Sequence, residues 1–73
     1  MTRKPIDEQF LEVMRAKGAT DQKAVNLVLI GPEMIAAGFT EEQAYRSLIN
    51  LAGEGIIVLD EETNRVSFPV DWH

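Results

Sequence analysis

The 73 residues are enough for one domain built around a single hydrophobic core. The chain has no cysteine, which excludes a disulfide framework and a thiolate metal site. Its net charge of −5 repels polyanions such as nucleic acids at long range.

The chain carries no signal for membrane insertion or secretion. The longest nearly apolar run, residues 24–30, is far too short to span a bilayer. Asp7 and Glu8 stand where a signal peptide would be apolar. A domain without cysteine also fits a reducing compartment, so we expect a cytoplasmic protein with no membrane contact.

Charge is distributed unevenly along the chain. Residues 1–23 carry five basic and four acidic side chains, whereas residues 24–73 carry two basic and eight acidic ones. A nucleic-acid contact made by the second part of the chain would therefore bring negative charges together.

The first predicted element is a helix at about residues 5–17. Pro5 suits a first helical turn, and Gly18 is a typical stop signal. Apolar side chains recur at helical spacing on one face, namely Ile6, Phe10, Val13 and Met14.

Two short elements follow. The apolar, β-branched run at 24–30 predicts either a short buried strand at about 25–30 or a turn of helix, because periodicity does not separate the two over so few residues. Pro32 then opens a short helix at about 32–37, which ends at Gly38.

A third helix is predicted at about residues 40–53. Thr40 and Gln43 have the spacing of a capping box, in which each side chain bonds the other residue's backbone N–H. Ala44, Leu48 and Leu51 share one face, with Tyr45 and Ile49 flanking it. This helix and the preceding one, joined by a tight glycine-containing turn, form a helix-turn-helix.

Beyond Gly55 the apolar pattern indicates a β-hairpin. We expect strands at about 56–59 and 65–68, joined by the turn 60–64, in which Asn64 tolerates a positive φ. The overall prediction is an α+β domain of three helices followed by a two-stranded hairpin.

This order of elements resembles the winged helix-turn-helix superfamily. The similarity is closest over Thr40–Ile57, TEEQAYRSLINLAGEGII, which looks like a capped recognition helix that enters the wing through Glu-Gly and two aliphatic residues. It extends over residues 31–68 at the level of motifs. The resemblance implies a fold that serves both DNA binding and protein docking.

In this superfamily the helix after the turn enters the major groove and the wing touches phosphates. Carried onto this chain, the groove-facing positions are Glu41, Glu42, Gln43, Arg46, Ser47 and Asn50, and the wing tip is residues 60–65. The chain departs from the pattern of DNA binders, because acids stand at the helix start and in the wing where basic or hydroxyl side chains would meet phosphates.

Each candidate site also has a purely structural interpretation. Glu41 and Glu42 either dock a basic partner or simply complement the helix dipole. The wing acids Asp60, Glu61 and Glu62 either extend an acidic surface that mimics phosphates or keep the hairpin edge from pairing. The trio Tyr45, Arg46 and Asn50 forms a contact patch, unless Tyr45 packs half-buried against the wing.

The C-terminal residues complete the list of candidates. Trp72 either packs on the domain's own core or anchors a partner or a second copy. His73 has no second histidine or cysteine with which to bind a transition metal. The chain has no catalytic motif and, at this size, little room for a concave pocket, so we expect neither catalysis nor a cofactor.

We therefore expect a non-catalytic protein-interaction module whose acidic face binds a protein with a basic surface. Such a module is an adaptor, a complex subunit or a small nucleic-acid-mimicking inhibitor of the phage type. The alternative is a DNA-binding transcriptional regulator, working as a dimer through the basic first helix. A single stripe of Arg15, Lys17, Lys23 and Arg46 would favour the regulator, and one continuous surface of Glu41, Glu42, Asp60, Glu61 and Glu62 the interaction module.

Overall fold

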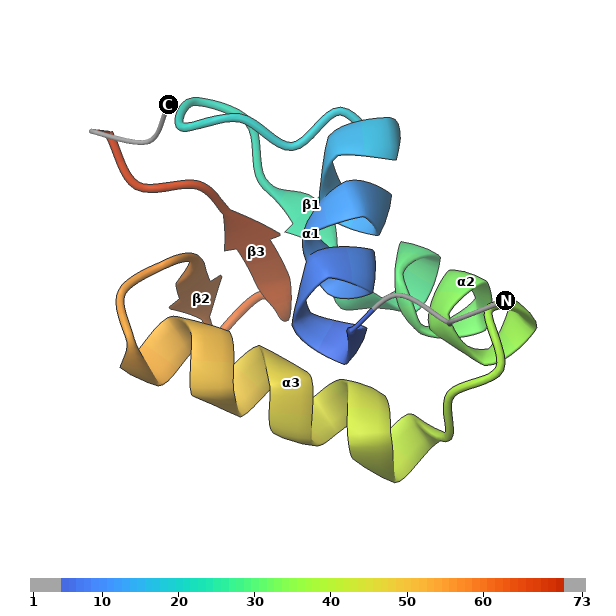
Figure 1. Cartoon of the computed structure of the whole chain (residues 1–73). Helices are drawn as coiled ribbons and strands as arrows, with labels where there is room; N and C mark the ends of the chain where they lie inside the picture. The colour runs from blue at the N-terminus through green and yellow to red at the C-terminus, as the bar shows by residue number, and fades with distance from the viewer. Residues whose placement is uncertain (1–4, 71–73) are drawn as a thin grey trace.

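The computed structural model describes residues 5–70 and shows helices packed around one core that a small sheet closes on one side (Figure 1). Trp72, His73, Arg3 and Lys4 lie outside the described residues. The elements are α1 (Ile6–Ala16), β1 (Val25–Asn26), the 3₁₀-helix η1 (Leu27–Leu29), α2 (Gly31–Ala36), α3 (Glu41–Gly53), β2 (Val58–Asp60) and β3 (Arg65–Ser67).

All three α-helices end in the same way. Gly18, Gly38 and Gly55 each have a positive φ, of 91°, 99° and 76°, which costs glycine little. In each case the N–H of the next residue donates to a carbonyl five residues back, the Schellman arrangement. The predicted stops at Gly18 and Gly38 are confirmed, and α3 closes at Gly55, two residues after its last helical residue.

The predicted amphipathic face of α1 is confirmed. Phe10, Val13 and Met14 are buried and Ile6 packs against them, while Pro5 caps the helix with a φ of −54°. The acidic residues of its first turn and the basic residue of its last turn complement the helix dipole.

The segment 24–30 contains both structures that the sequence left open, each shorter than predicted. The strand covers only Val25–Asn26, because the Asn26 side chain accepts a hydrogen bond from the Val28 N–H (3.0 Å) and starts a 3₁₀ turn. The expectation of a buried run was wrong at two positions, since Val28 and Leu29 are exposed on η1.

Helices α2 and α3 follow each other closely and are joined by a short turn, as the sequence predicted. Thr40 Oγ1 accepts from the Gln43 N–H (3.1 Å), and Gln43 Oε1 accepts from the Thr40 N–H (2.9 Å). This is the capping box expected from the sequence, and it fixes where α3 begins. The short α2 begins one residue before Pro32 and ends at Ala36.

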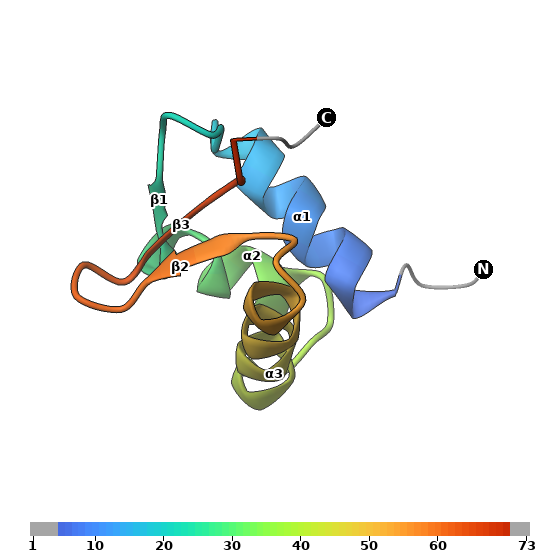
Figure 2. The same cartoon turned by 90° about the vertical axis from the view of Figure 1, so that its left-hand side faces the viewer.

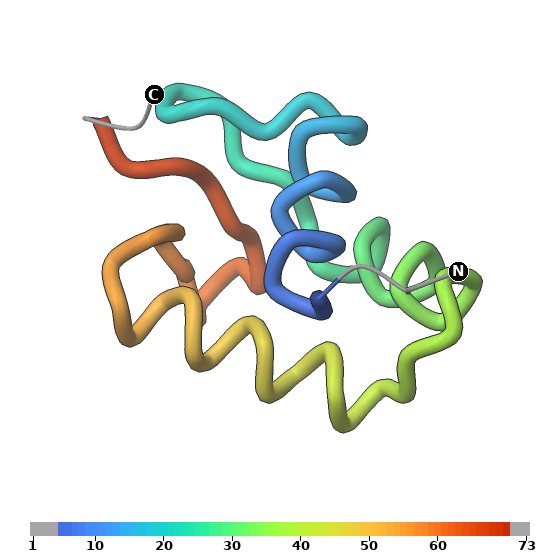
Figure 3. The backbone as a smooth tube through the Cα atoms, viewed as in Figure 1, coloured from blue at the N-terminus to red at the C-terminus, as the bar shows by residue number. Residues whose placement is uncertain are grey.

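The sheet is antiparallel, has the order β1-β3-β2, and has three strands rather than the two expected for the hairpin alone. The predicted strand at 56–59 was wrong in its start: β2 begins at Val58, because the N–H of Ile56 donates to the Leu51 carbonyl (3.0 Å) to close α3. Ile57 then enters the core instead of pairing. Figure 3 traces this turn between α3 and β2. In the hairpin turn, Asn64 has the expected positive φ of 54°.

The core lies where the inner faces of the helices meet the inner face of the sheet. Its fully buried side chains come from all three α-helices and from β3, and include Phe10, Met14, Met34, Leu51 and Val66. The helix and strand content of the α+β prediction is confirmed. Within residues 5–70, no helix combines the length and the apolar character that spanning a bilayer requires.

Candidate functional surface on α3 and the hairpin

Helix α3 has one buried face and one exposed face. Ala44, Ser47, Leu48 and Leu51 are buried, as the helical spacing predicted for the three apolar members. The side turned to solvent carries most of the predicted contact residues, and we call it the outer face of α3: Glu41, Glu42, Tyr45, Arg46, Ile49 and Asn50.

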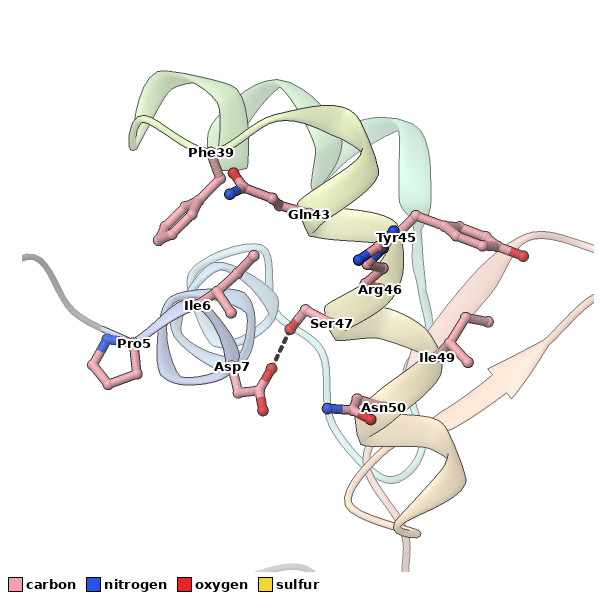
Figure 4. A pocket seen from close by; sticks show the side chains of 10 residues that line it. All are labelled: Pro5, Ile6, Asp7, Phe39, Gln43, Tyr45, Arg46, Ser47, Ile49 and Asn50. Carbon is pink, nitrogen blue, oxygen red and sulfur yellow. Dashed lines mark hydrogen bonds between the residues drawn. The ribbon is translucent and has the colours of Figure 1, made fainter.

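Two large apolar side chains stand in the middle of this outer face. Tyr45 is 63% exposed and Ile49 is 45% exposed, one helical turn apart. Figure 4 shows both pointing away from α1. The alternative in which Tyr45 packs half-buried against the hairpin is therefore wrong.

Glu42 and Arg46 neutralise each other along the outer face. The Arg46 guanidinium donates to Glu42 Oε1 at 2.7 Å, an i,i+4 pair in which both side chains are about three-quarters exposed. An exposed pair of this kind contributes roughly 0.3–0.5 kcal/mol. Among residues 5–70, Glu41 at the start of α3 has no ion pair of its own.

A broad groove of about 920 Å³ separates the outer face from the start of α1. The groove is larger than the sequence led us to expect. Asp7 and Ser47 meet in it (Figure 4), and the Ser47 hydroxyl donates to Asp7 Oδ1 at 2.6 Å. Ser47 is only 3% exposed and is the one buried polar residue among residues 5–70. The bond ties α1 to α3, so Ser47 has a structural role instead of the groove-reading role implied by the resemblance.

A second, smaller groove of about 260 Å³ runs between α2 and α3. Leu27, Ile35 and Tyr45 form its walls, and Glu41 stands beside them. Buried core residues, including Phe10 and Leu48, form its floor. We call it the α2–α3 groove.

The acids of the hairpin lie at and just beyond the end of β2. Asp60 pairs in register with Arg65, and its Oδ1 accepts from the Glu62 N–H (3.0 Å), which shapes the turn. Glu61 and Glu62 are exposed. Figure 2 shows that the hairpin projects to one side of α3. The five predicted acids therefore occupy two places, the start of α3 and the hairpin, instead of one continuous surface.

Basic side chains gather at the other end of the molecule. Arg15 lies in the last turn of α1, 5.6 Å over the ring of Phe68, and Lys17 pairs with Glu33 at 3.8 Å. This end of α1 points away from α3 in Figure 1. Arg15 and Lys17 thus form no stripe with Arg46, which lies on α3.

Neither groove was predicted, because chain segments that are far apart in the sequence form each of them, two for the larger groove and three for the smaller. The sequence did indicate one part of the groove walls, because Tyr45 and Ile49 are apolar positions that flank the buried face of α3. The exposed Ile35, 47% accessible on α2, had no such signal. Among the described residues, no group of acidic or histidine side chains is arranged to hold a metal ion.

Comparisons of the chain with protein-family models, with curated proteins and with solved structures found no match.

Proposed function

We propose that this domain is a non-catalytic protein-interaction module on a winged-helix scaffold. The order of helices and strands and the sheet order β1-β3-β2 support the scaffold, with the β2–β3 hairpin as the wing. The module binds through the outer face of α3 and works in the cytoplasm, where domains without disulfides are common. Its role is that of an adaptor, a complex subunit or a small inhibitor that mimics nucleic acid.

The observation that carries this proposal is the exposure of Tyr45 and Ile49 in the middle of α3. A helix that reads DNA presents groups that donate hydrogen bonds to phosphates and base edges. A tyrosine and an isoleucine, with Arg46 beside them, instead have the composition of the centre of a protein interface, in which tyrosine and arginine are enriched.

The distribution of charge also favours a protein partner over DNA. Glu41 has no ion pair among the described residues, and the hairpin adds Glu61 and Glu62. Each acid within about 4–6 Å of a phosphate is repulsive by roughly 1 kcal/mol at a wet surface. These acids attract a basic protein surface for the same reason, and faster association follows.

The test is a matched pair of measurements. Fluorescence anisotropy with random-sequence duplex DNA at low salt should show no binding by the wild-type protein. Affinity capture with the purified domain as bait should retain a partner that is lost from the Tyr45→Ala/Ile49→Ala variant and from Glu41→Lys/Glu42→Lys. Val70→Ala, at an exposed position outside α3, is the control and should keep the partner.

A DNA-binding transcriptional regulator is the second candidate, because basic side chains gather at the end of α1. DNA binding with a steep negative salt slope would support it and replace our proposal, since such a slope counts neutralised phosphates. Arg15→Glu/Lys17→Glu should then abolish binding, while the α3 variants should leave it unchanged.

A further inference from the structure

The α2–α3 groove reaches down to the edge of the hydrophobic core. Its floor is made of side chains that are almost fully buried, such as Phe10, Ile30 and Leu48, at 2%, 1% and 4% exposure. Its walls are half-exposed, with Ile35 at 47% and Tyr45 at 63%. Its volume of about 260 Å³ exceeds the roughly 150 Å³ of a cavity that holds a benzene ring. One large apolar side chain therefore fits in it.

The groove has the form of an interface hot spot. Such sites are pockets near the centre of a contact, lined by aromatic and aliphatic groups, into which the partner inserts an anchor. Filling this groove would cover the exposed parts of Ile35 and Tyr45 at once. The apolar area removed from water by that step drives binding at about 25 cal/mol per Å² before the costs of association.

One acidic side chain lines the groove, and the chain segment that carries the hairpin acids is bonded to its opposite wall. Glu41 lines it at the start of α3. On the opposite wall, the Leu27 N–H donates to the Asn64 carbonyl at 2.8 Å, which joins this wall to the hairpin turn with Glu61 and Glu62. The nearby cations are already opposite acids, Arg46 beside Glu42 and Arg65 in register with Asp60.

This distribution of charge determines the kind of occupant. A second copy of the chain would bring another net charge of −5 to an already acidic rim. A segment with positive charges beside an apolar anchor instead complements Glu41 at the groove and the net negative charge of the chain. We propose that the α2–α3 groove binds a short segment of a basic protein by taking in one large apolar side chain flanked by lysine or arginine. This inference rests on the proposed function, and it names the kind of partner.

The experiment uses the ¹⁵N-labelled protein and three synthetic peptides. The probe is acetyl-Gly-Lys-Lys-Gly-Phe-Gly-Lys-Lys-Gly-amide. In one comparison peptide alanine replaces the phenylalanine, and in the other glutamate replaces all four lysines. Amide shifts on titration with the probe should concentrate at Leu27, Gly31, Ile35 and Tyr45. The alanine peptide should bind at least about tenfold more weakly, and the glutamate peptide should not bind.

Protein variants separate this inference from the proposed function. Ile35→Ser should weaken binding of the probe, whereas Val58→Ser, on β2 outside this groove, should leave it unchanged. Both positions are about half exposed, and amide spectra confirm that each variant folds. Glu41→Lys should also weaken binding.

Several results would overturn the inference, and they differ in whether they also overturn the proposed function. If the probe fails to shift the groove amides, or the glutamate peptide binds as well as the lysine peptide, the groove has no such occupant. A partner captured through Ile49 and unaffected by Ile35→Ser would keep the proposed function and reject the groove. Duplex DNA binding, with all three peptides inert, would reject both.

Discussion

The two faces of α3 have opposite tasks, although they belong to the same 13 residues. On the inner face, Leu48 and Leu51 are 4% and 1% exposed, and the single polar group, Ser47, is bonded to Asp7. On the outer face, Tyr45 and Ile49 remain accessible, and the side chains of the charged pair Glu42–Arg46 are about three-quarters exposed. Burial of the inner face holds the domain together, whereas the outer face is available for a partner. Substitutions on the inner face should therefore lower the free energy of unfolding, and substitutions on the outer face should weaken binding of a partner.

The largest loss of stability should follow truncation of the inner face at its most buried position. Leu51→Ala should lower the free energy of unfolding by about 2–5 kcal/mol, because the core loses a buried side chain and keeps part of the cavity. Urea denaturation followed by circular dichroism measures this. Ile49→Ala is the control on the same helix, and an equal loss in both variants would contradict the division between faces.

The next largest effect should come from the polar link between α1 and α3. Asp7→Ala leaves the Ser47 hydroxyl, 3% exposed, without its acceptor, which should cost about 1–3 kcal/mol. Asp7→Asn retains an acceptor and should cost less. The free energies of unfolding of Asp7→Ala, Ser47→Ala and the double variant Asp7→Ala/Ser47→Ala, compared with the wild type, complete a double-mutant cycle. Strict additivity in that cycle would mean that the bond contributes nothing.

The cap of α3 should come third. Thr40→Ala removes the side-chain acceptor of the Gln43 N–H and should cost about 1 kcal/mol. Thr40→Ser keeps the hydroxyl and should stay close to the wild-type stability in the same denaturation experiment. If both variants lose the same amount, the methyl group of Thr40, and not the capping bond, stabilises this end of the helix.

The smallest effect on stability should come from the outer face. Tyr45→Ala and Ile49→Ala should each change the free energy of unfolding by no more than about 0.5 kcal/mol, because neither side chain is buried. Thermal unfolding measures this difference. A loss above about 2 kcal/mol would show that these side chains support the fold, and their exposure would then carry no argument for a partner.

Local patterns explain why much of the fold was predicted from the sequence. The apolar spacing of α1, the capping box at Thr40 and the left-handed residue Asn64 each depend on neighbours within a few positions. The start of β2 was missed because Ile56 and Ile57 look like strand residues. Their backbone completes the α3 terminus instead, and Ile57 fills the core, which is a tertiary effect.

The candidate surface could be predicted only in part, for a related reason. All eight predicted contact residues are exposed, and the sequence indicated which of them share a helix. It did not indicate that Glu42 is neutralised by Arg46, since an i,i+4 spacing permits an ion pair without requiring it. The grooves depend on how α1, α2 and η1 approach α3, and no local pattern encodes those distances.

The position of β3 in the sheet has a consequence for how this chain folds. The central strand comes last among the described elements, and Val66 pairs with Val25 across an interval of 40 residues. Neither β1 nor β2 has a partner until β3 is in place. Helices with local contacts form quickly, but closing so long a loop has an entropic cost that must be met first. A nascent chain would therefore hold its helices together loosely, and the sheet would assemble in one late, cooperative step.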